Sequence, residues 1–320
     1  MAAKTQERRS AGTSSLDRKL PFRQIKRSWF FRAAGFLAAL ILLLSLSPEP
    51  TLLQITFLGD VMLGRGVYRA STRVSDWQPF RELMPIIKNA DILAANLESP
   101  LTIAPVVTRG YALCAPPAQV ETLRDASFDL VTFANNHTLD CGQTGRSQTL
   151  LTLRAFGIRA VEPAPYVEFV NVRNRRLAFI ALDDVTRPID QPAAINAIRD
   201  AKNRADTLII SIHWGNEYQA APSTRQRSLA AMLSKAGADV IIGHHPHVIQ
   251  PLEIIDRGKY KTPALVFYSL GNAIFDQYGL EDTRTGQVIS LVFGPSGSIT
   301  YTIRQFKLDP KRGTILQLPP

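Results

Sequence analysis

The chain has 320 residues, of which 45% are hydrophobic and 20% charged, so it can bury a substantial core. Its two cysteines exclude a multi-bridge disulfide scaffold, an all-cysteine zinc site and an iron–sulfur cluster. The formal net charge is +10, but residues 1–32 hold nine basic and two acidic residues, a net +7, which leaves +3 for the rest. Because the positive charge forms a tail rather than a folded face, the sequence predicts no nucleic-acid partner.

Residues 1–32 are predicted to be a basic cytoplasmic tail, and the uncharged run 33–47 a transmembrane signal-anchor. As a helix this run spans about 22 Å, and the aromatic residues 29–31 extend it to about 27 Å, close to the thickness of the hydrocarbon core. The positive-inside rule puts the N-terminus in the cytoplasm and everything after Pro48 outside. We therefore expect single-pass anchoring in the membrane bilayer. A cleaved signal peptide that releases a secreted protein is the main alternative, and a buried core helix is a third.

Residues 48–320 are predicted to form one extracytoplasmic domain, because no polar linker interrupts them after Pro48-Glu49-Pro50. Strands are predicted at 52–58, 91–95, 128–134, 167–172, 176–182, 207–212 and 240–242. Helices are predicted at 79–89, 117–126, 144–156, 192–205 and 223–236. From about residue 249 the chain becomes β-rich, with turns at 256–259 and 295–298. This alternation predicts an α/β domain whose sheets are covered by helices, with a mixed second sheet.

Polar residues of the kind that bind ligands follow the predicted buried strands. All five histidines of the chain are among them. Binding sites form at this edge in open α/β sheets. The residues at the strand ends are Asp60, Glu98, Asn135, Asn136, His137, Asp140, His213, His244, His245, His247 and Asn272.

The segment 244–247, His-His-Pro-His, is the strongest local signal for metal or catalysis, because imidazole is the commonest metal ligand and proline fixes the backbone. Taken alone, Asp60 is typical of a residue that caps a turn, and Glu98 is typical of an exposed loop carboxylate. Taken alone, the histidines are typical of side chains that form hydrogen bonds on a polar loop. Together, carboxylate, amide and imidazole donors suit a pair of divalent ions. Arg65 could contact an anionic substrate, and the alternative is a solvated arginine.

Six blocks of sequence, in their order along the chain, resemble the motifs of one family. They are LGDVMLGR, ANLESPLT, FANNHTLDCG, ISIHWGNEY, GADVIIGHHPHVIQPLE and YSLGN. They resemble the CapA/PgsA capsule-synthesis family of bacterial poly-γ-glutamate production, within the calcineurin-like metallophosphoesterase superfamily. The resemblance covers roughly residues 52–293 and implies a four-layer αββα sandwich with a site for two divalent ions, Mn, Fe or Zn.

The resemblance also implies roles for single residues. His137 would be catalytic, and the metal ligands would be Asp60, Glu98, Asn136, His213, His245 and His247. Candidates for substrate contact are Arg65, Asn135, His244 and Asn272. The chain departs from the superfamily at three positions. Met62 stands where a histidine is usual, Glu98 replaces an aspartate, and Ala273 follows the last motif. The changes at Met62 and Glu98 imply a weaker first metal site.

Two functions follow from these observations. The first is a membrane-anchored, metal-dependent hydrolase of a phosphoester or an amide in capsule or poly-γ-glutamate synthesis or export. The second is a non-catalytic accessory subunit that binds an anionic polymer and joins a membrane synthase or export complex. The retained histidines favour the first, and Met62 favours the second. Cys114 and Cys141 would face an oxidising compartment, either as a disulfide or as two unpaired thiols.

Overall fold

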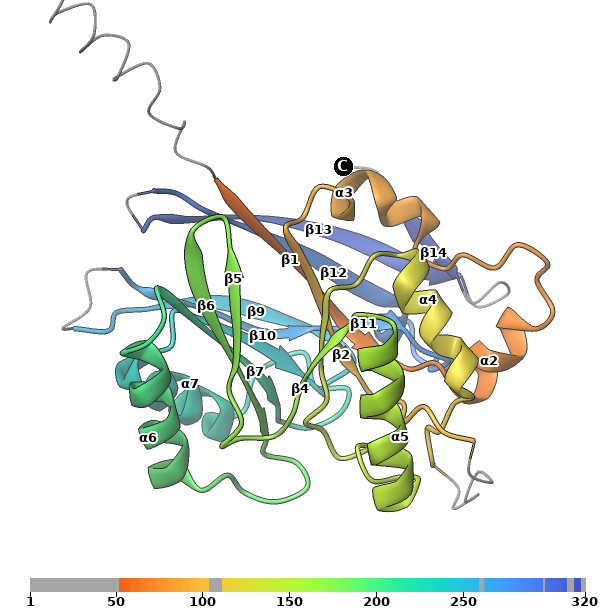
Figure 1. Cartoon of the computed structure of the whole chain (residues 1–320), viewed down its shortest axis with the longest axis horizontal. Helices are drawn as coiled ribbons and strands as arrows, with labels where there is room; N and C mark the ends of the chain where they lie inside the picture. The colour runs from red at the N-terminus through yellow and green to blue at the C-terminus, as the bar shows by residue number, and fades with distance from the viewer. Residues whose placement is uncertain (1–51, 104–110, 259–261, 296, 310–313, 318–320) are drawn as a thin grey trace, which may run out of the picture. The chain divides into compact units, whose positions relative to one another are not determined.

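Two mixed β-sheets form the centre of the folded part of the chain in the computed structural model (Figure 1). The structure describes residues 52–103, 111–258, 262–295, 297–309 and 314–317. The predicted tail and anchor, residues 1–47, lie outside the described residues. Within the described ranges, no helix has the length and apolar character needed to cross a membrane.

The first sheet combines a parallel half and an antiparallel half around β1. Its order is β14-β13-β12-β1-β2-β3-β4, and β11 also pairs with β1. β1 to β4 run parallel to one another, whereas β12, β13 and β14 run antiparallel to their neighbours. The bounds are β1 (Leu53–Val61), β2 (Ile92–Leu97), β3 (Leu130–Thr132), β4 (Arg159–Val161), β11 (Asn272–Ile274), β12 (Thr285–Phe293), β13 (Ile299–Asp309) and β14 (Thr314–Gln317).

The second sheet has the order β5-β6-β7-β8-β10-β9. Its four middle strands run parallel, and an antiparallel strand closes each edge. The bounds are β5 (Glu168–Val172), β6 (Arg175–Asp183), β7 (Thr207–His213), β8 (Val240–His244), β9 (Ile249–Ile255) and β10 (Ala264–Leu270). The mixed second sheet predicted from the β-rich C-terminal part is therefore present, but that part also supplies strands to the first sheet.

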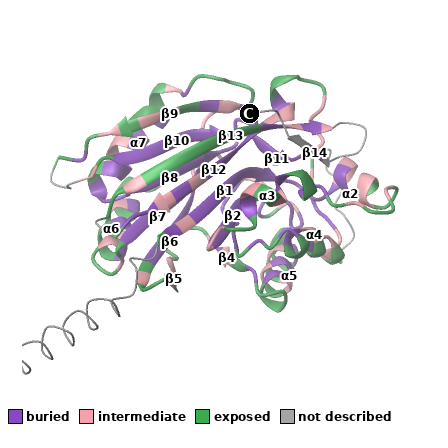
Figure 2. Ribbon diagram, turned by 90° about the horizontal axis from the view of Figure 1, so that it is seen from above, coloured by how far each residue is buried: buried purple, intermediate pink, exposed green. Residues whose placement is uncertain are grey.

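Helices cover the outer faces of both sheets, and a shared apolar layer lies between the sheets. The first sheet carries α2 (Arg65–Ser71), α3 (Met84–Ile87), α4 (Val120–Asp125) and α5 (Gly142–Ala155). The second carries α6 (Gln191–Lys202) and α7 (Thr224–Ala236). Figure 2 shows the strands mostly buried and the helices exposed on one side. Three short 3-10 helices complete the described part: η1 (Arg81–Leu83), η2 (Pro117–Gln119) and η3 (Asp282–Arg284).

The local signals in the sequence explain most of these boundaries. Ser223 caps α7 through a capping box with Gln226, as the predicted helix start requires. The hairpin between β5 and β6 turns at Arg173 and Asn174, which both have positive φ, as in the turns that suit hairpins. The predicted helix 79–89 is instead the short η1–α3 pair. The prediction missed α2 and β4, which are only 7 and 3 residues long.

The chain crosses from the second sheet to the first at Gly271, the one residue between β10 and β11. A Cβ atom on Gly59 in β1 would lie 1.8 Å from the Gly271 carbonyl oxygen. Because the obstructing atom is backbone, Gly59→Ala is expected to lower the free energy of unfolding by about 3 kcal/mol or more. Urea denaturation would measure this. Gly279→Ala is the control, since a Cβ there meets nothing within 4 Å, and equal midpoints for both variants would contradict this packing.

Candidate metal centre

The polar side chains at the ends of the parallel strands of both sheets lie together in one place. Asp60, at the end of β1, has its Oδ1 atom 3.0 Å from Nδ1 of His244 at the end of β8. Asn136, after β3, accepts a hydrogen bond on Oδ1 from Nε2 of His213 at the end of β7, at 2.9 Å. Strands that run parallel end at the same edge, so residues far apart in sequence come into contact there.

Asp60 contacts several side chains of this centre. Its carboxylate accepts hydrogen bonds from Asn96 Nδ2 at 2.9 Å and from the His245 main-chain nitrogen at 3.2 Å. Nδ1 of His247 lies 3.3 Å from its second oxygen. Burial by itself raises the pKa of Asp60, but the hydrogen bonds and charge of His244 and His247 outweigh burial and hold this pKa well below its usual value. The Asp60 side chain is therefore an ionised carboxylate that contacts the imidazoles of His244 and His247.

Glu98 lies directly after β2 and is completely buried. Its Oε1 atom accepts from Asn96 Nδ2 at 3.1 Å, while its Oε2 atom has no hydrogen-bond partner among the residues that the structure describes. Burial, followed by the charge of Asp60, raises the pKa of Glu98 well above its usual value. Two buried carboxylates in contact repel each other, so a cation placed between them would be stabilising.

His213 joins these carboxylates and is also buried. Its Nε2 atom lies 3.9 Å from Glu98 Oε1, and ligand atoms of Asp60, Glu98 and His213 all lie within 4.8 Å of one another. Burial, followed by the charge of His245, lowers the pKa of His213 well below its usual value, which keeps the imidazole neutral. Neutral imidazole and ionised carboxylate are the forms that bind metals.

His137 lies beside this group and is half-buried, with 16% of its side chain exposed. Its Nδ1 atom lies 2.9 Å from Asp140 Oδ2, and its Nε2 atom lies 3.2 Å from Asn136 Nδ2. Asp140 in turn accepts a hydrogen bond from the main-chain nitrogen of Leu113 at 2.8 Å. The ring is thus fixed by a carboxylate on one side and faces the ligand-type residues on the other.

A disulfide between Cys114 and Cys141 lies next to this arrangement. Of the two states left open by the sequence, the structure has the bonded one. The bridge directly follows Leu113 and Asp140, which are themselves hydrogen-bonded, so it fastens together the two segments that orient His137.

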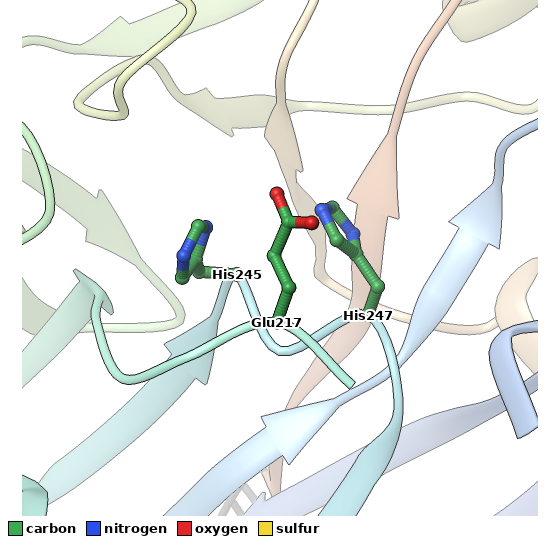
Figure 3. A group of neighbouring side chains, drawn as sticks. All are labelled: Glu217, His245 and His247. Carbon is green, nitrogen blue, oxygen red and sulfur yellow. The ribbon is translucent and has the colours of Figure 1, made fainter. Parts of the chain in front are cut away.

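A second group of donors combines Glu217 with His245 and His247, whose ligand atoms also lie within 4.8 Å of one another (Figure 3). The His245 ring lies 4.7 Å from the His213 ring, so the two groups adjoin. Burial, followed by the charge of His247, lowers the pKa of His245 to about 4. The Nδ1 atom of His245 is buried without a hydrogen-bond partner among the described residues.

The remaining predicted residues support the centre from around it. Asn272 accepts a hydrogen bond from His247 Nδ1 at 2.9 Å, and Asn135 Nδ2 donates to Asn96 Oδ1 at 3.0 Å. Arg65 forms an ion pair with Asp276. These three side chains, like His244 beside Asp60, all contact protein groups. Their contact with substrate stays a prediction.

Met62, two residues after Asp60, is completely buried in the apolar layer beneath α2 to α5. Its sulfur accepts from the main-chain nitrogen of Gly64 at 3.1 Å. The first strand therefore contributes Asp60 alone to the donors.

Sequence reasoning assigned no role to three residues of this centre, although Asp140 was among the polar residues at the strand ends. Asn96 connects Asp60 to Glu98, Asp140 orients His137, and Glu217 lies between two histidines. Asn96 is a polar residue inside a buried strand, two positions before Glu98, which could have drawn attention to it. Glu217 follows His213 by four residues in the block ISIHWGNEY, but nothing in the sequence indicates which way that loop turns.

The donor set suits divalent cations. Two carboxylates, one amide oxygen and three imidazoles lie together, and the partnerless Glu98 Oε2 and His245 Nδ1 are unusual for buried polar atoms in a folded protein. Residues with larger exposure, Asn136, His137 and Glu217, leave the centre open to solvent on one side. Such a centre can bind cations and an anionic group of a substrate.

Comparison with known proteins gives the family. The model of "Bacterial capsule synthesis protein PGA_cap" matches residues 54–277. PGA biosynthesis protein CapA of Bacillus subtilis (strain 168) is 31% identical over 269 residues, 77% of this chain and 69% of that protein. Capsule biosynthesis protein CapA of Bacillus anthracis is 31% identical over 253 residues, 70% of this chain and 60% of that protein, so the match spans less than two thirds of the latter.

A solved structure has the same fold. The crystal structure of a hypothetical protein from Thermus thermophilus superposes with a TM-score of 0.52 at 18% identity, over 79% of this chain and 99% of that chain. The resemblance found in the six sequence blocks is confirmed by the family match, which contains every candidate residue from Asp60 to Asn272. The chain belongs to the family of the bacterial capsule synthesis protein PGA_cap.

Proposed function

We propose that the chain is a membrane-anchored, metal-dependent hydrolase of the cell surface that acts in capsule or poly-γ-glutamate synthesis or export. Asp60, Glu98 and His213 support this most directly, since they are buried together with donor atoms within 4.8 Å of one another. Burying two carboxylates in contact is costly unless a cation joins them. The helix–sheet–sheet–helix order supports placing the fold in the calcineurin-like metallophosphoesterase superfamily.

The residues that would hold the metal are Asp60, Glu98, Asn136, His213, His245 and His247. When bound, divalent cations polarise a substrate oxygen and make water a better nucleophile. Asp140 keeps a proton on Nδ1 of His137, so the opposite nitrogen of the ring is the one that exchanges a proton with a leaving group. Asn96 holds Asp60 and Glu98 in place through one amide.

Metal analysis joined to a substrate screen tests this proposal. The purified full chain would be loaded with Mn²⁺ or Zn²⁺ and its bound metal measured by mass spectrometry. Phosphomonoesters, phosphodiesters and γ-glutamyl amides would then be screened for turnover. Bound metal with turnover of one class supports the hydrolase. A chain without stoichiometric metal would overturn it.

Anchoring makes a separate prediction. The tail and uncharged run favour a cytoplasmic N-terminus, and the Cys114–Cys141 disulfide suits an oxidising compartment outside. Alkaline phosphatase fused after Pro320 is expected to be active, and a fusion to a reporter that works only in the cytoplasm is expected to be inactive. The opposite pattern would contradict this topology. A mature N-terminus near residue 48 would favour signal cleavage over anchoring.

A specific observation supports an alternative function. Met62 lies in the apolar core where a histidine ligand is usual in the superfamily, so the centre has one donor fewer. A weakened centre would suit an accessory subunit that binds an anionic polymer and joins a membrane synthase without catalysis. Metal binding without turnover of any substrate class would favour this alternative.

A further inference from the structure

Glu217 belongs to no strand. It lies beside the loop that contains His245, Pro246 and His247, called here the histidine loop. Figure 3 shows its side chain between His245 and His247, and ligand atoms of the three residues lie within 4.8 Å of one another. Glu217 itself is exposed, whereas both histidines are buried. One carboxylate with two imidazoles is a common protein donor set for divalent transition metals such as Zn²⁺ and Mn²⁺.

Main-chain contacts hold Glu217 in this position. The nitrogen of the next residue, Tyr218, donates to the Pro246 carbonyl at 2.8 Å, which fastens the loop after β7 onto the histidine loop. The Tyr218 hydroxyl accepts from Gln277 Nε2 at 3.2 Å. Tyr218 is therefore held through both its main-chain nitrogen and its side-chain hydroxyl. These contacts fix the position of the neighbouring Glu217 beside the histidines.

The same two loops contain three residues with strained backbone conformations. Tyr218, His245 and His247 have φ angles of 63°, 93° and 57°, in the left-handed region that side chains other than glycine avoid. Each such residue costs on the order of 1–3 kcal/mol, and strain of this kind gathers at ligand sites. The strained residues are the donors His245 and His247 and Tyr218, the neighbour of the donor Glu217.

Next to Asp60, the first strand adds no further donor among the residues that the structure describes. Beyond Asp60, β1 continues into the apolar core, where the sulfur of Met62 accepts a hydrogen bond from the Gly64 main chain. Nδ1 of His247 lies 3.3 Å from Asp60 Oδ2, and donor atoms of His247 and Glu217 lie within 4.8 Å of each other. Among the described residues, Glu217 is the carboxylate whose donor atoms group with those of His245 and His247.

We propose that Glu217 is a metal ligand, and that with His245 and His247 it holds a divalent transition cation next to the one held by Asp60, Glu98 and His213. This inference rests on the proposed function, because it assigns a ligand to the same centre. Met62 supplies no donor where a histidine is usual, and the exposed Glu217 adds a carboxylate donor from the solvent side of the centre.

Metal titration of the full chain tests the proposal. Wild type, Glu217→Gln and Glu217→His would be stripped with chelator, titrated with Mn²⁺ and with Zn²⁺ by calorimetry, and analysed for bound metal. Glu82→Gln is the matched control, since Glu82 is an exposed glutamate in η1, away from the centre. Wild type and Glu82→Gln are expected to bind two ions.

Glu217→Gln is expected to bind one of the two ions at least about 100-fold more weakly, because even outer partners of metal ligands are worth 10–100-fold. Glu217→His restores a donor and is expected to bind both. If Glu217→Gln binds both ions with wild-type affinity, the inference is overturned while the centre stands. If wild type binds a single ion that Glu217→Gln retains, the inference is likewise overturned. If wild type binds none, the proposed function falls as well.

Discussion

His137→Ala is expected to leave the metal content of the chain unchanged and to lower turnover by about 10²–10⁴-fold, the usual contribution of a general acid or base. His137 is half-buried and belongs to neither of the two donor groups, but its ring is fixed by Asp140 and lies next to Asn136. Its position therefore suits proton transfer rather than metal binding. Steady-state kinetics with the substrate class found in the screen, together with metal analysis, would measure both effects.

Leu139→Ala is the matched control for this variant. Leu139 lies two residues along the same loop and is 52% exposed, so its removal disturbs the surface of the loop without touching the centre. It is expected to keep both metal and turnover. Loss of metal in His137→Ala would show that the ring is a ligand, and full turnover in that variant would exclude a catalytic role.

The strands and the positions of most site residues could be predicted because both depend on local sequence. Buried strands are apolar runs bounded by turns, and parallel strands bring the residues that follow them to one edge. Asp60 and His213 lie at the ends of β1 and β7, and Glu98 directly follows β2, so their meeting depends on parallel strands in two facing sheets. The pattern did not indicate that the β-rich C-terminal part adds strands to the first sheet.

The parts that could not be predicted depend on contacts between distant segments. Arg65 was a candidate for substrate contact, and its partner Asp276 lies 211 residues away. Glu217 lies in a loop that is joined to the histidines by the hydrogen bond from the Tyr218 nitrogen to the Pro246 carbonyl, a contact that no local pattern encodes. The pairing of Cys114 with Cys141 likewise depends on a distance that sequence cannot give.

His247→Ala is expected to remove one bound ion and with it the stabilisation that the ion provides. The His247 ring lies near Asp60 and Glu217 and is held by Asn272, so its loss takes away a donor that no neighbouring imidazole on that side of Pro246 replaces. A ligand at 100 times its Kd stabilises a protein by about 2.7 kcal/mol. Thermal unfolding of the full chain with and without Mn²⁺ would show a smaller rise in Tm for the variant.

Phe275→Leu separates loss of a donor from loss of packing, because the Phe275 ring packs 4.8 Å from the His247 ring and offers no ligand atom. This control is expected to keep both ions and the full rise in Tm.

The comparison of His247→Ala with His137→Ala in a host that makes capsule then decides between the two functions. A hydrolase needs both histidines, so both variants would stop capsule production. If His247→Ala stops it and His137→Ala does not, the metal serves binding or structure, and the accessory function is the correct one.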